Sequence, residues 1–291
     1  MNDFEYAATT TVEDAVQLLT ARGDGAKILA GGTDILVQLR EGQRDADLVV
    51  DIKKIPLLSE IEFNSARGLK LGAAVPCCDI YDHADVAEAY PALADAARII
   101  GGWQIQSRAC IGGNLCNSSP AADGIPPLIV YDVTCHIAGP EGSRTLPVAE
   151  FCTAPGRNVL GPGEILTTLE FPALAANSGA AYQRFIPRNE MDIAVVGAAS
   201  WVQLDSAGKT IESARIALAA VAPTPVFADE ASAWLAGQPA TEETFVRVGE
   251  LARSSATPIS DMRGTAEYRT HLVGILTQRT LAIAVERARS A

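Results

Sequence analysis

Two pairs of glycines, each followed by small polar side chains, are the part of this sequence most suited to chemistry. The first pair lies in residues 31–34 (Gly-Gly-Thr-Asp), directly after the apolar run 28–30 (Ile-Leu-Ala). The second lies in residues 112–114 (Gly-Gly-Asn), after Cys110 and Ile111. A glycine lets backbone N–H groups approach a bound group without an intervening Cβ, and successive N–H groups hold phosphate oxygens. Two such loops predict two walls around one extended cofactor that carries phosphate.

The elements around the first loop are those that would bring it to a ligand. Residues 11–14 (Thr-Val-Glu-Asp) form a capping box, and apolar residues follow at helical spacing until Gly23 and Gly25 end the helix. Residues 27–30 predict a strand that delivers Gly31, residues 35–39 predict a short helix, and residues 48–52 predict a second buried strand. Because helix and strand alternate, residues 1–55 are expected to form a small α/β unit with parallel strands.

The next region has a different pattern. Residues 69–73 and 165–171 predict strands, and residues 134–146 predict a hairpin around the turn 139–142. The stretch 84–100 is helical in pattern but contains Pro91, so two short helices are expected. These elements predict a mixed, largely antiparallel second lobe.

The last part of the chain predicts strands followed by helices. Residues 172–179 are the best linker candidate, and residues 195–218 predict a hairpin. Helices are expected near 227–236, 242–255 and 268–288, which gives an α+β C-terminal domain. The expected fold class is therefore α+β, with a two-lobed domain at 1–176 (lobes about 1–55 and 56–176) and a C-terminal domain at 177–291.

Taken in order, these motifs resemble the FAD-binding medium subunit of the molybdenum hydroxylases, the xanthine dehydrogenase and aerobic carbon monoxide dehydrogenase family. The resemblance covers nearly the whole chain, and its matching segments are 30–34, 111–114, 119–123 (Ser-Pro-Ala-Ala-Asp), 163–166 (Gly-Glu-Ile-Leu), and Arg188 with 192–194 (Asp-Ile-Ala). It implies an FAD domain of the vanillyl-alcohol oxidase/p-cresol methylhydroxylase type, followed by a C-terminal domain of the carbon monoxide dehydrogenase flavoprotein type.

The resemblance also implies a non-covalent FAD between the two lobes, with its pyrophosphate held mainly by main-chain N–H groups of the two glycine loops. Asp123 is expected to accept a hydrogen bond from an FAD hydroxyl, and Arg184 to lie near the pyrimidine end of the flavin. The implied cofactor-binding residues are Ile28, Leu29, Ala30, Gly31, Gly32, Thr33, Asp34, Ile35, Cys110, Ile111, Gly112, Gly113, Asn114, Asp123, Leu166, Arg184 and Ile193. No catalytic residue and no metal ligand is implied.

Several of these residues have a plainer alternative. Asp123 precedes a glycine and could simply form a turn, and Leu166 could be an ordinary core residue. Arg184 could form a surface ion pair. Ile193 is expected close to the isoalloxazine ring, where some relatives carry an aromatic residue. Cys110 stands where Thr or Ser is usual, which weakens any side-chain hydrogen bond there.

The cysteines and histidines give no convincing metal site. The six cysteines at 77, 78, 110, 116, 135 and 152 include no Cys-x-x-Cys pair, so buried, reduced thiols are expected, with a site at Cys110 and Cys116 as the alternative. The 4-hydroxybenzoyl-CoA reductase branch of the family carries an iron–sulfur cluster on an insertion after the second glycine loop, and this chain has no insertion between Asn114 and Pro126. No histidine lies in the glycine loops, so no histidyl–flavin bond is expected.

Composition narrows the class of protein. The 291 residues carry a formal net charge of −12, which argues against nucleic-acid binding because such proteins present basic patches. No apolar run approaches the roughly 20 residues that span a bilayer, and the first residues lack a secretion signal. A cytoplasmic protein without a membrane span is expected.

The resemblance finally implies a function within a larger enzyme. Medium subunits of the family work with a small subunit that carries two [2Fe-2S] clusters and a large molybdopterin subunit, and a dimer of heterotrimers is expected. Electrons would pass from the clusters through FAD to an external acceptor. The alternatives are a self-sufficient flavin-dependent oxidase or dehydrogenase and a flavin-free assembly subunit. The organic substrate and the acceptor are not indicated.

Overall fold

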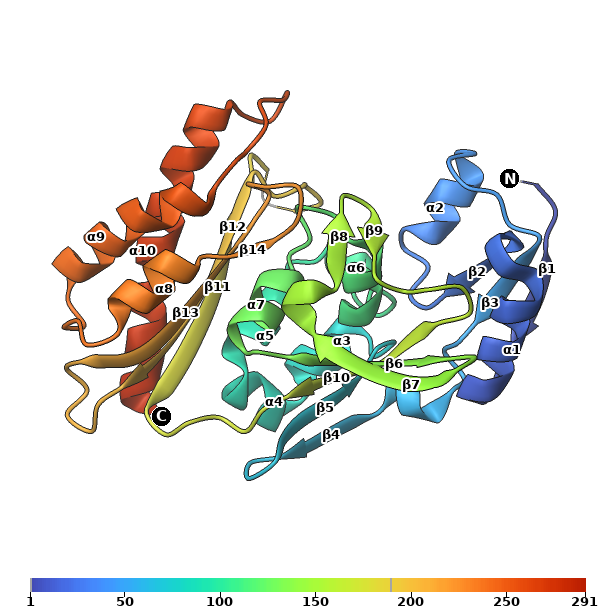
Figure 1. The fold of residues 1–291 in the computed structure, drawn as a ribbon, viewed down its shortest axis with the longest axis horizontal. Coiled ribbons are helices and arrows are strands. Elements are labelled where there is room, and N and C mark those ends of the chain that lie inside the picture. The colour runs from blue at the N-terminus through green and yellow to red at the C-terminus, as the bar shows by residue number, and fades with distance from the viewer. Residues whose placement is uncertain (1, 189) are drawn as a thin grey trace.

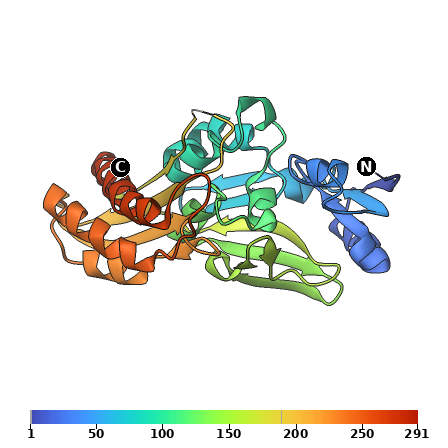
Figure 2. The same ribbon diagram turned by 90° about the horizontal axis from the view of Figure 1, so that it is seen from above.

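The computed structural model describes residues 2–188 and 190–291, and in it three units lie in a row along the longest axis (Figure 1). The first is built on a small parallel sheet, the second on a five-stranded antiparallel sheet, and the third on a four-stranded antiparallel sheet backed by helices. Figure 2, seen from above, shows the same row with the first unit at one end and the C-terminal helices at the other.

The first unit has the predicted α/β character. Its elements are β1 (Glu5–Ala8), α1 (Val12–Arg22), the 3₁₀ helix η1 (Gly23–Gly25), β2 (Ala26–Leu29), α2 (Ile35–Arg40), β3 (Leu48–Asp51) and the 3₁₀ helix η2 (Pro56–Ser59). The three strands are parallel in the order β1-β3-β2. The central strand β3 is buried along its whole length, as its Leu-Val-Val sequence predicts.

The predicted start and end of α1 are confirmed. The Thr11 side chain accepts a hydrogen bond from the N–H of Asp14 at 3.1 Å, which satisfies a donor that the helix itself leaves free. Gly23 ends the helix with a φ of +51°, a left-handed value that glycine adopts at little cost. This helix packs on the sheet through Ala15 and Leu19.

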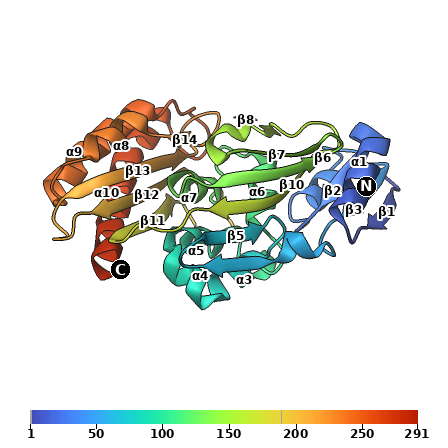
Figure 3. The ribbon, with the colours of Figure 1, turned by 60° about the horizontal axis from the view of Figure 1, so that its bottom comes forward.

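The second unit contains the five-stranded sheet, in the order β4-β5-β10-β6-β7, and its strands β5, β10, β6 and β7 lie side by side in Figure 3. The strands are β4 (Ile61–Asn64), β5 (Gly68–Gly72), β6 (Thr134–Gly139), β7 (Gly142–Pro147) and β10 (Ile165–Phe171), with β8 (Cys152–Ala154) and β9 (Arg157–Asn158) as a separate pair. The helices are α3 (Cys77–Asp82), α4 (Ala84–Ala89), α5 (Pro91–Ala97), η3 (Trp103–Ile105), α6 (Ile111–Asn117), α7 (Ile125–Val130) and η4 (Val148–Glu150). The predicted hairpin is confirmed, and Pro91 separates two short helices as predicted, because it begins α5.

The third unit has the predicted order of strands and then helices. Its elements are β11 (Ser178–Phe185), β12 (Val196–Leu204), β13 (Ile211–Ala219), β14 (Val226–Phe227), α8 (Asp229–Leu235), α9 (Glu242–Ala252), η5 (Arg253–Ser255) and α10 (Ala266–Ser290). The long helix α10 packs on β11 and β12, while α5 and α7 of the second unit contact the same sheet. In the described part of the chain, no helix is both long enough and apolar enough to cross a membrane.

One expected segment is shorter than predicted. The sequence predicts a linker at 172–179, but Ser178 and Gly179 already belong to β11, which pairs with β12 along its whole length. A side chain at Gly179 would collide with the backbone of α10 around Ala284 and Arg287, so the glycine belongs to a close strand–helix contact. The sequence suggested a linker because Asn, Ser and Gly are common in loops.

Candidate functional site

A cavity of about 420 Å³ lies between the first and second units, and both glycine loops line it. Its volume is in the range of small-molecule sites, roughly 300–1,000 Å³. The predicted residues that line it are Ile28, Ala30, Gly31, Gly32, Thr33, Asp34, Ile35, Cys110, Gly112, Gly113, Asn114 and Leu166. The two loops, far apart in sequence, therefore form walls of one space.

The first loop begins at the carboxyl end of β2, the edge where open parallel sheets place their ligands. Gly32 has a φ of +81°, which most side chains would occupy only with strain, and a Cβ there would lie 2.9 Å from Cδ1 of Leu29. A Cβ on Gly31 would collide with the carbonyl of Arg108, just before the second loop. Gly31 is thus needed for the two walls to touch.

The second loop opens a helix, which the sequence did not predict. Gly112 and Gly113 lie in the first turn of α6, where backbone N–H groups have no partner within the helix. A Cβ on Gly112 would collide with the backbone of Ala73, whereas a Cβ on Gly113 would meet only Sγ of Cys110, at 2.9 Å. Gly112 therefore serves packing, and Gly113 keeps the cavity wall open.

Asn114 has its carbonyl group committed within the protein. Its Oδ1 accepts a hydrogen bond from the N–H of Gly124 at 3.0 Å, which leaves the Nδ2 group available to a ligand in the cavity. Asp34, on the opposite wall, lies at the start of α2, and burial raises the pKa of its carboxyl. Burial also raises the pKa of the Cys110 thiol, and the N–H groups of Gly113 and Gly31 oppose that rise.

Five of the predicted residues do not line this cavity. Leu29 is buried against Leu39 and Val49, and Ile111 belongs to the large core of the second unit, so both support the loops from behind. The other three are Asp123, Arg184 and Ile193, of which Ile193 is 51% exposed.

Asp123 and Arg184 are brought together in a buried cluster. Nη1 of Arg184 on β11 lies 2.5 Å from Oδ2 of Asp123, and both side chains are less than one tenth exposed. The Tyr182 hydroxyl donates a 2.7 Å hydrogen bond to the other carboxylate oxygen. Burial raises the pKa of the Asp123 carboxyl, while Arg184 and Tyr182 oppose that rise. The sequence predicts a separate role for each of these two residues and does not indicate that they pair.

An ion pair on one side of the cavity, between Arg144 and Glu164, is not predicted by the sequence. We call this pair the latch. Glu164 accepts two hydrogen bonds from Arg144 of β7, each 2.7 Å, and one from the N–H of Gly161 at 2.6 Å. Arg144 also donates to the carbonyl of Val159 at 3.0 Å, so it fixes the segment 159–164, most of which lines the cavity. The Gly-Pro-Gly sequence at 161–163 signalled a turn, but nothing in the sequence pointed to Arg144 as its partner.

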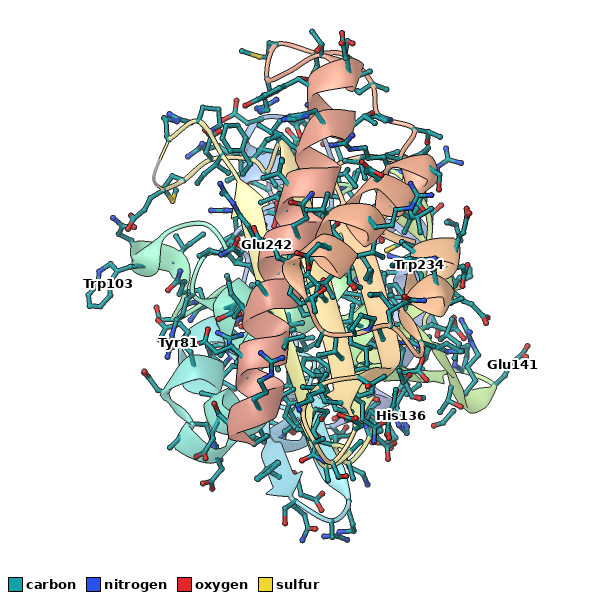
Figure 4. All side chains as sticks on the ribbon, turned by 90° about the vertical axis from the view of Figure 1, so that its left-hand side faces the viewer. Tyr81, Trp103, His136, Glu141, Trp234 and Glu242 are labelled. Carbon is teal, nitrogen blue, oxygen red and sulfur yellow. The ribbon has the colours of Figure 1, made fainter. Side chains whose placement is uncertain are left out.

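The histidines and the most exposed aromatic residue lie outside the cavity. His136 pairs with Glu170 at 2.6 Å on the antiparallel sheet, and Figure 4 labels it in the lower right part of the molecule, away from Trp103 at the left. Trp103 is 77% exposed and projects into solvent. Within residues 2–188 and 190–291, no three His, Cys, Asp or Glu side chains are grouped to hold a metal ion.

Comparisons with known proteins agree along the chain. The family described as FAD binding domain in molybdopterin dehydrogenase matches residues 2–174, and that described as CO dehydrogenase flavoprotein C-terminal domain matches residues 180–284. The xanthine dehydrogenase FAD-binding subunit of Escherichia coli O157:H7 is 33% identical over 290 residues, covering 99% of this chain and 98% of that protein. The carbon monoxide dehydrogenase medium chain of Hydrogenophaga pseudoflava is 31% identical over 284 residues, covering 98% of each.

A solved structure gives the same result for the fold. A chain in the crystal structure of the cyanide-inactivated Cu,Mo-CO dehydrogenase superposes with a TM-score of 0.93 at 29% identity, covering 98% of this chain and 99% of the other. This chain belongs to the FAD-binding medium subunits of the molybdenum hydroxylases. It is a subunit of an oxidoreductase, and its cofactor is FAD.

The cavity of this medium subunit fits FAD by the chemistry of its walls. The first-turn N–H groups of α6, which have no carbonyl partner within the helix, the Nδ2 group of Asn114 and the hydroxyl of Thr33 are donors suited to phosphate oxygens. Gly113 leaves room that a Cβ would fill. Ile28, Leu166 and Ile165 add apolar wall for the rest of the molecule.

Proposed function

We propose that this chain is the FAD-carrying electron-transfer subunit of a heteromeric molybdenum hydroxylase. The observation that carries the proposal is the single cavity walled by both glycine loops, in a chain of this family. The flavin, when bound, supplies the ability to accept electrons from a one-electron carrier and to pass them to an external acceptor. The protein holds the cofactor and sets its surroundings.

The residues divide into groups by the part of FAD they would hold. The two loops, 28–35 and 110–114, hold the pyrophosphate through N–H groups, and Leu166 contacts the cofactor from β10. Asp123 accepts a hydrogen bond from an FAD hydroxyl, and Arg184 places positive charge near the pyrimidine end, where it would favour the anionic reduced flavin. Ile193 would contact the isoalloxazine ring. The cofactor is non-covalent.

The buried pair suits these roles because the positive charge of Arg184 offsets the desolvation penalty of a charged Asp123 inside the protein.

The domain division is proposed as 1–176 and 177–291, with lobes at about 1–55 and 56–176. The two-lobed part is of the vanillyl-alcohol oxidase/p-cresol methylhydroxylase type. In support, residues of β2 in the parallel sheet and of β10 in the five-stranded sheet both line the cavity.

The partners are a small iron–sulfur subunit with [2Fe-2S] clusters and a large molybdopterin subunit, assembled as a dimer of heterotrimers in the cytoplasm. Support comes from relatives described as a subunit or a medium chain of dehydrogenases, whose length this chain matches almost completely. Substrate would be oxidised at molybdenum in the large subunit, and electrons would reach this chain through the clusters.

The first test is the flavin content of the purified chain. One FAD per chain should be released into the supernatant by acid precipitation, and its mass should identify FAD. Flavin retained in the pellet would contradict non-covalent binding, FMN would contradict a pyrophosphate site, and a colourless chain that takes up no added FAD would favour an assembly subunit.

The chain, alone and with its partners, should then be tested with xanthine, nicotinate, caffeine and carbon monoxide, which the names of its relatives suggest.

A further inference from the structure

Two cationic side chains line the cavity within the described residues, Lys27 and Arg44. Lys27 is engaged, because its ammonium group donates to the backbone carbonyl of Asp24. Arg44 follows α2, and its N–H donates to the carbonyl of Gln38 at 3.3 Å, so its backbone lies beside Gln38, which is one helical turn after Asp34 and also lines the cavity. An arginine side chain can bridge such a distance.

The charges around Arg44 set it apart from Arg144, which pairs with a carboxylate of the cavity lining. The cavity lining also contains Asp24, Asp34 and Glu164, and Arg144 already neutralises Glu164. In the described part of the chain, no carboxylate oxygen lies within 4.0 Å of the Arg44 guanidinium, and its side chain is exposed. In a protein of net charge −12, this leaves a cation without an ionic partner at the rim of the cavity.

FAD carries its negative charge on the pyrophosphate, since the adenosine and ribityl parts are neutral at pH 7. A guanidinium offers a planar fork of N–H donors that matches phosphate oxygens, and hydrogen bonds between ions are about twice as strong as neutral ones. We propose, on the basis of the function proposed above, that the Arg44 guanidinium binds the pyrophosphate of FAD and closes the cavity on the side of the 41–46 loop. The glycine loops supply N–H groups, and Arg44 supplies the countercharge.

The test is a titration of flavin-depleted protein with FAD. Arg44→Met keeps much of the side-chain bulk but removes the charge, and it should weaken FAD binding about 10-fold to 100-fold. Arg44→Lys should lose less, and Arg44→Glu more. The matched control is Arg40→Ala, because Arg40 is 67% exposed, pairs with Glu41 and does not line the cavity. Circular dichroism and the thermal midpoint should be unchanged in all four variants.

The salt dependence of binding locates the effect on the charged part of the ligand. Wild-type affinity should fall as NaCl is raised from 50 to 500 mM, and the fall should be shallower in Arg44→Met. Wild-type affinity in Arg44→Met, or a loss no greater than in Arg40→Ala, would overturn the inference, as would an equal loss in Arg44→Lys and Arg44→Glu. If wild-type protein bound no FAD, the proposed function itself would fail, and the wild-type titration shows this separately.

Discussion

Asp123 and Arg184 form an ion pair that is nearly removed from solvent, with Oδ2 and Nη1 2.5 Å apart. The pair joins the segment after the second glycine loop to β11 of the third unit. Tyr182, two residues before Arg184 on the same strand, donates to the same carboxylate from its hydroxyl. One buried charge cluster therefore ties the flavin-binding part of the chain to its C-terminal sheet.

Breaking this ion pair should lower the free energy of unfolding, and the loss should be larger when one charge is removed than when both are. Asp123→Leu leaves a buried guanidinium without its countercharge and should lower the free energy of unfolding by about 3–5 kcal/mol. The double variant Asp123→Leu/Arg184→Met should lose clearly less, because neither charge remains. Tyr182→Phe should lose about 1 kcal/mol. Chemical denaturation of the flavin-depleted proteins measures these three variants and the single variant Arg184→Met. A double variant as destabilised as the sum of Asp123→Leu and Arg184→Met would contradict coupling.

Gly113→Ala should produce a folded protein that binds little flavin. A Cβ there meets only Sγ of Cys110 within 4 Å, so the substitution affects the cavity wall more than the core. Losing two N–H···O⁻ contacts, each worth about 1.5–3 kcal/mol, would weaken binding by several kcal/mol. The measurement is flavin per chain after purification, with thermal denaturation as the check on folding.

Two controls make the Gly113 experiment specific. Gly264→Ala introduces a Cβ in ordinary contact far from the cavity and should retain its flavin. Cys110→Ala combined with Gly113→Ala removes the one steric neighbour, so flavin loss should persist if the cavity wall is the cause. Recovery of flavin in the double variant would show instead that the sulfur contact was responsible.

The latch between Arg144 and Glu164 should contribute stability that depends on pH. Hydrogen bonds from Arg144 hold the pKa of the Glu164 carboxyl below its usual value, and the Gly161 N–H adds to this. A lowered folded-state pKa gives stability that is fully present above the unfolded value, about 4.3, and is lost as the pH falls through the folded value. The difference in unfolding free energy between wild type and Glu164→Gln should therefore be constant above about pH 5 and shrink below about pH 4.

The control for this prediction is Glu88→Gln. Glu88 is exposed, and no ion pair is found for it among residues 2–188 and 190–291. Its substitution should give a small difference that does not follow the same acid transition. A Glu164→Gln difference that persisted unchanged to pH 3.5 would mean that the latch contributes through shape and not through charge.

The cysteines should not hold iron. Within residues 2–188 and 190–291, no three His, Cys, Asp or Glu side chains are grouped to hold a metal ion, and burial raises the pKa of the Cys116 thiol and raises that of Cys135 to about 12. Purified chain should contain neither iron nor acid-labile sulfide, and Cys116→Ser should keep a spectrum of flavin alone. Stoichiometric iron lost on that substitution would contradict the assignment of all clusters to a partner.

Elements with a strong local signal could be predicted from the sequence, and those that depend on distant contacts could not. Thr11 and Pro91 act on the backbone within a few residues of themselves, so the sequence alone predicts the helices that they begin. The helix α6 could not be predicted, because two adjacent glycines disfavour a helix, and the close contact of Gly112 with Ala73 is made only in the fold. The loops of the site were visible from their glycines. The partners of Asp123 and Glu164 lie 61 and 20 residues away, and only the fold brings them close.

Electron relay is the central claim, and reduction of the flavin by substrate tests it most directly. The absorbance of bound FAD near 450 nm should be followed without oxygen in the isolated chain and in the chain assembled with its iron–sulfur and molybdopterin subunits. Dithionite should bleach the flavin in both preparations, whereas the organic substrate should bleach it only in the assembly. If the isolated chain were reduced by that substrate and turned it over at an ordinary enzymatic rate, on the order of 10 per second, the relay would be contradicted and a self-sufficient flavin enzyme would take its place.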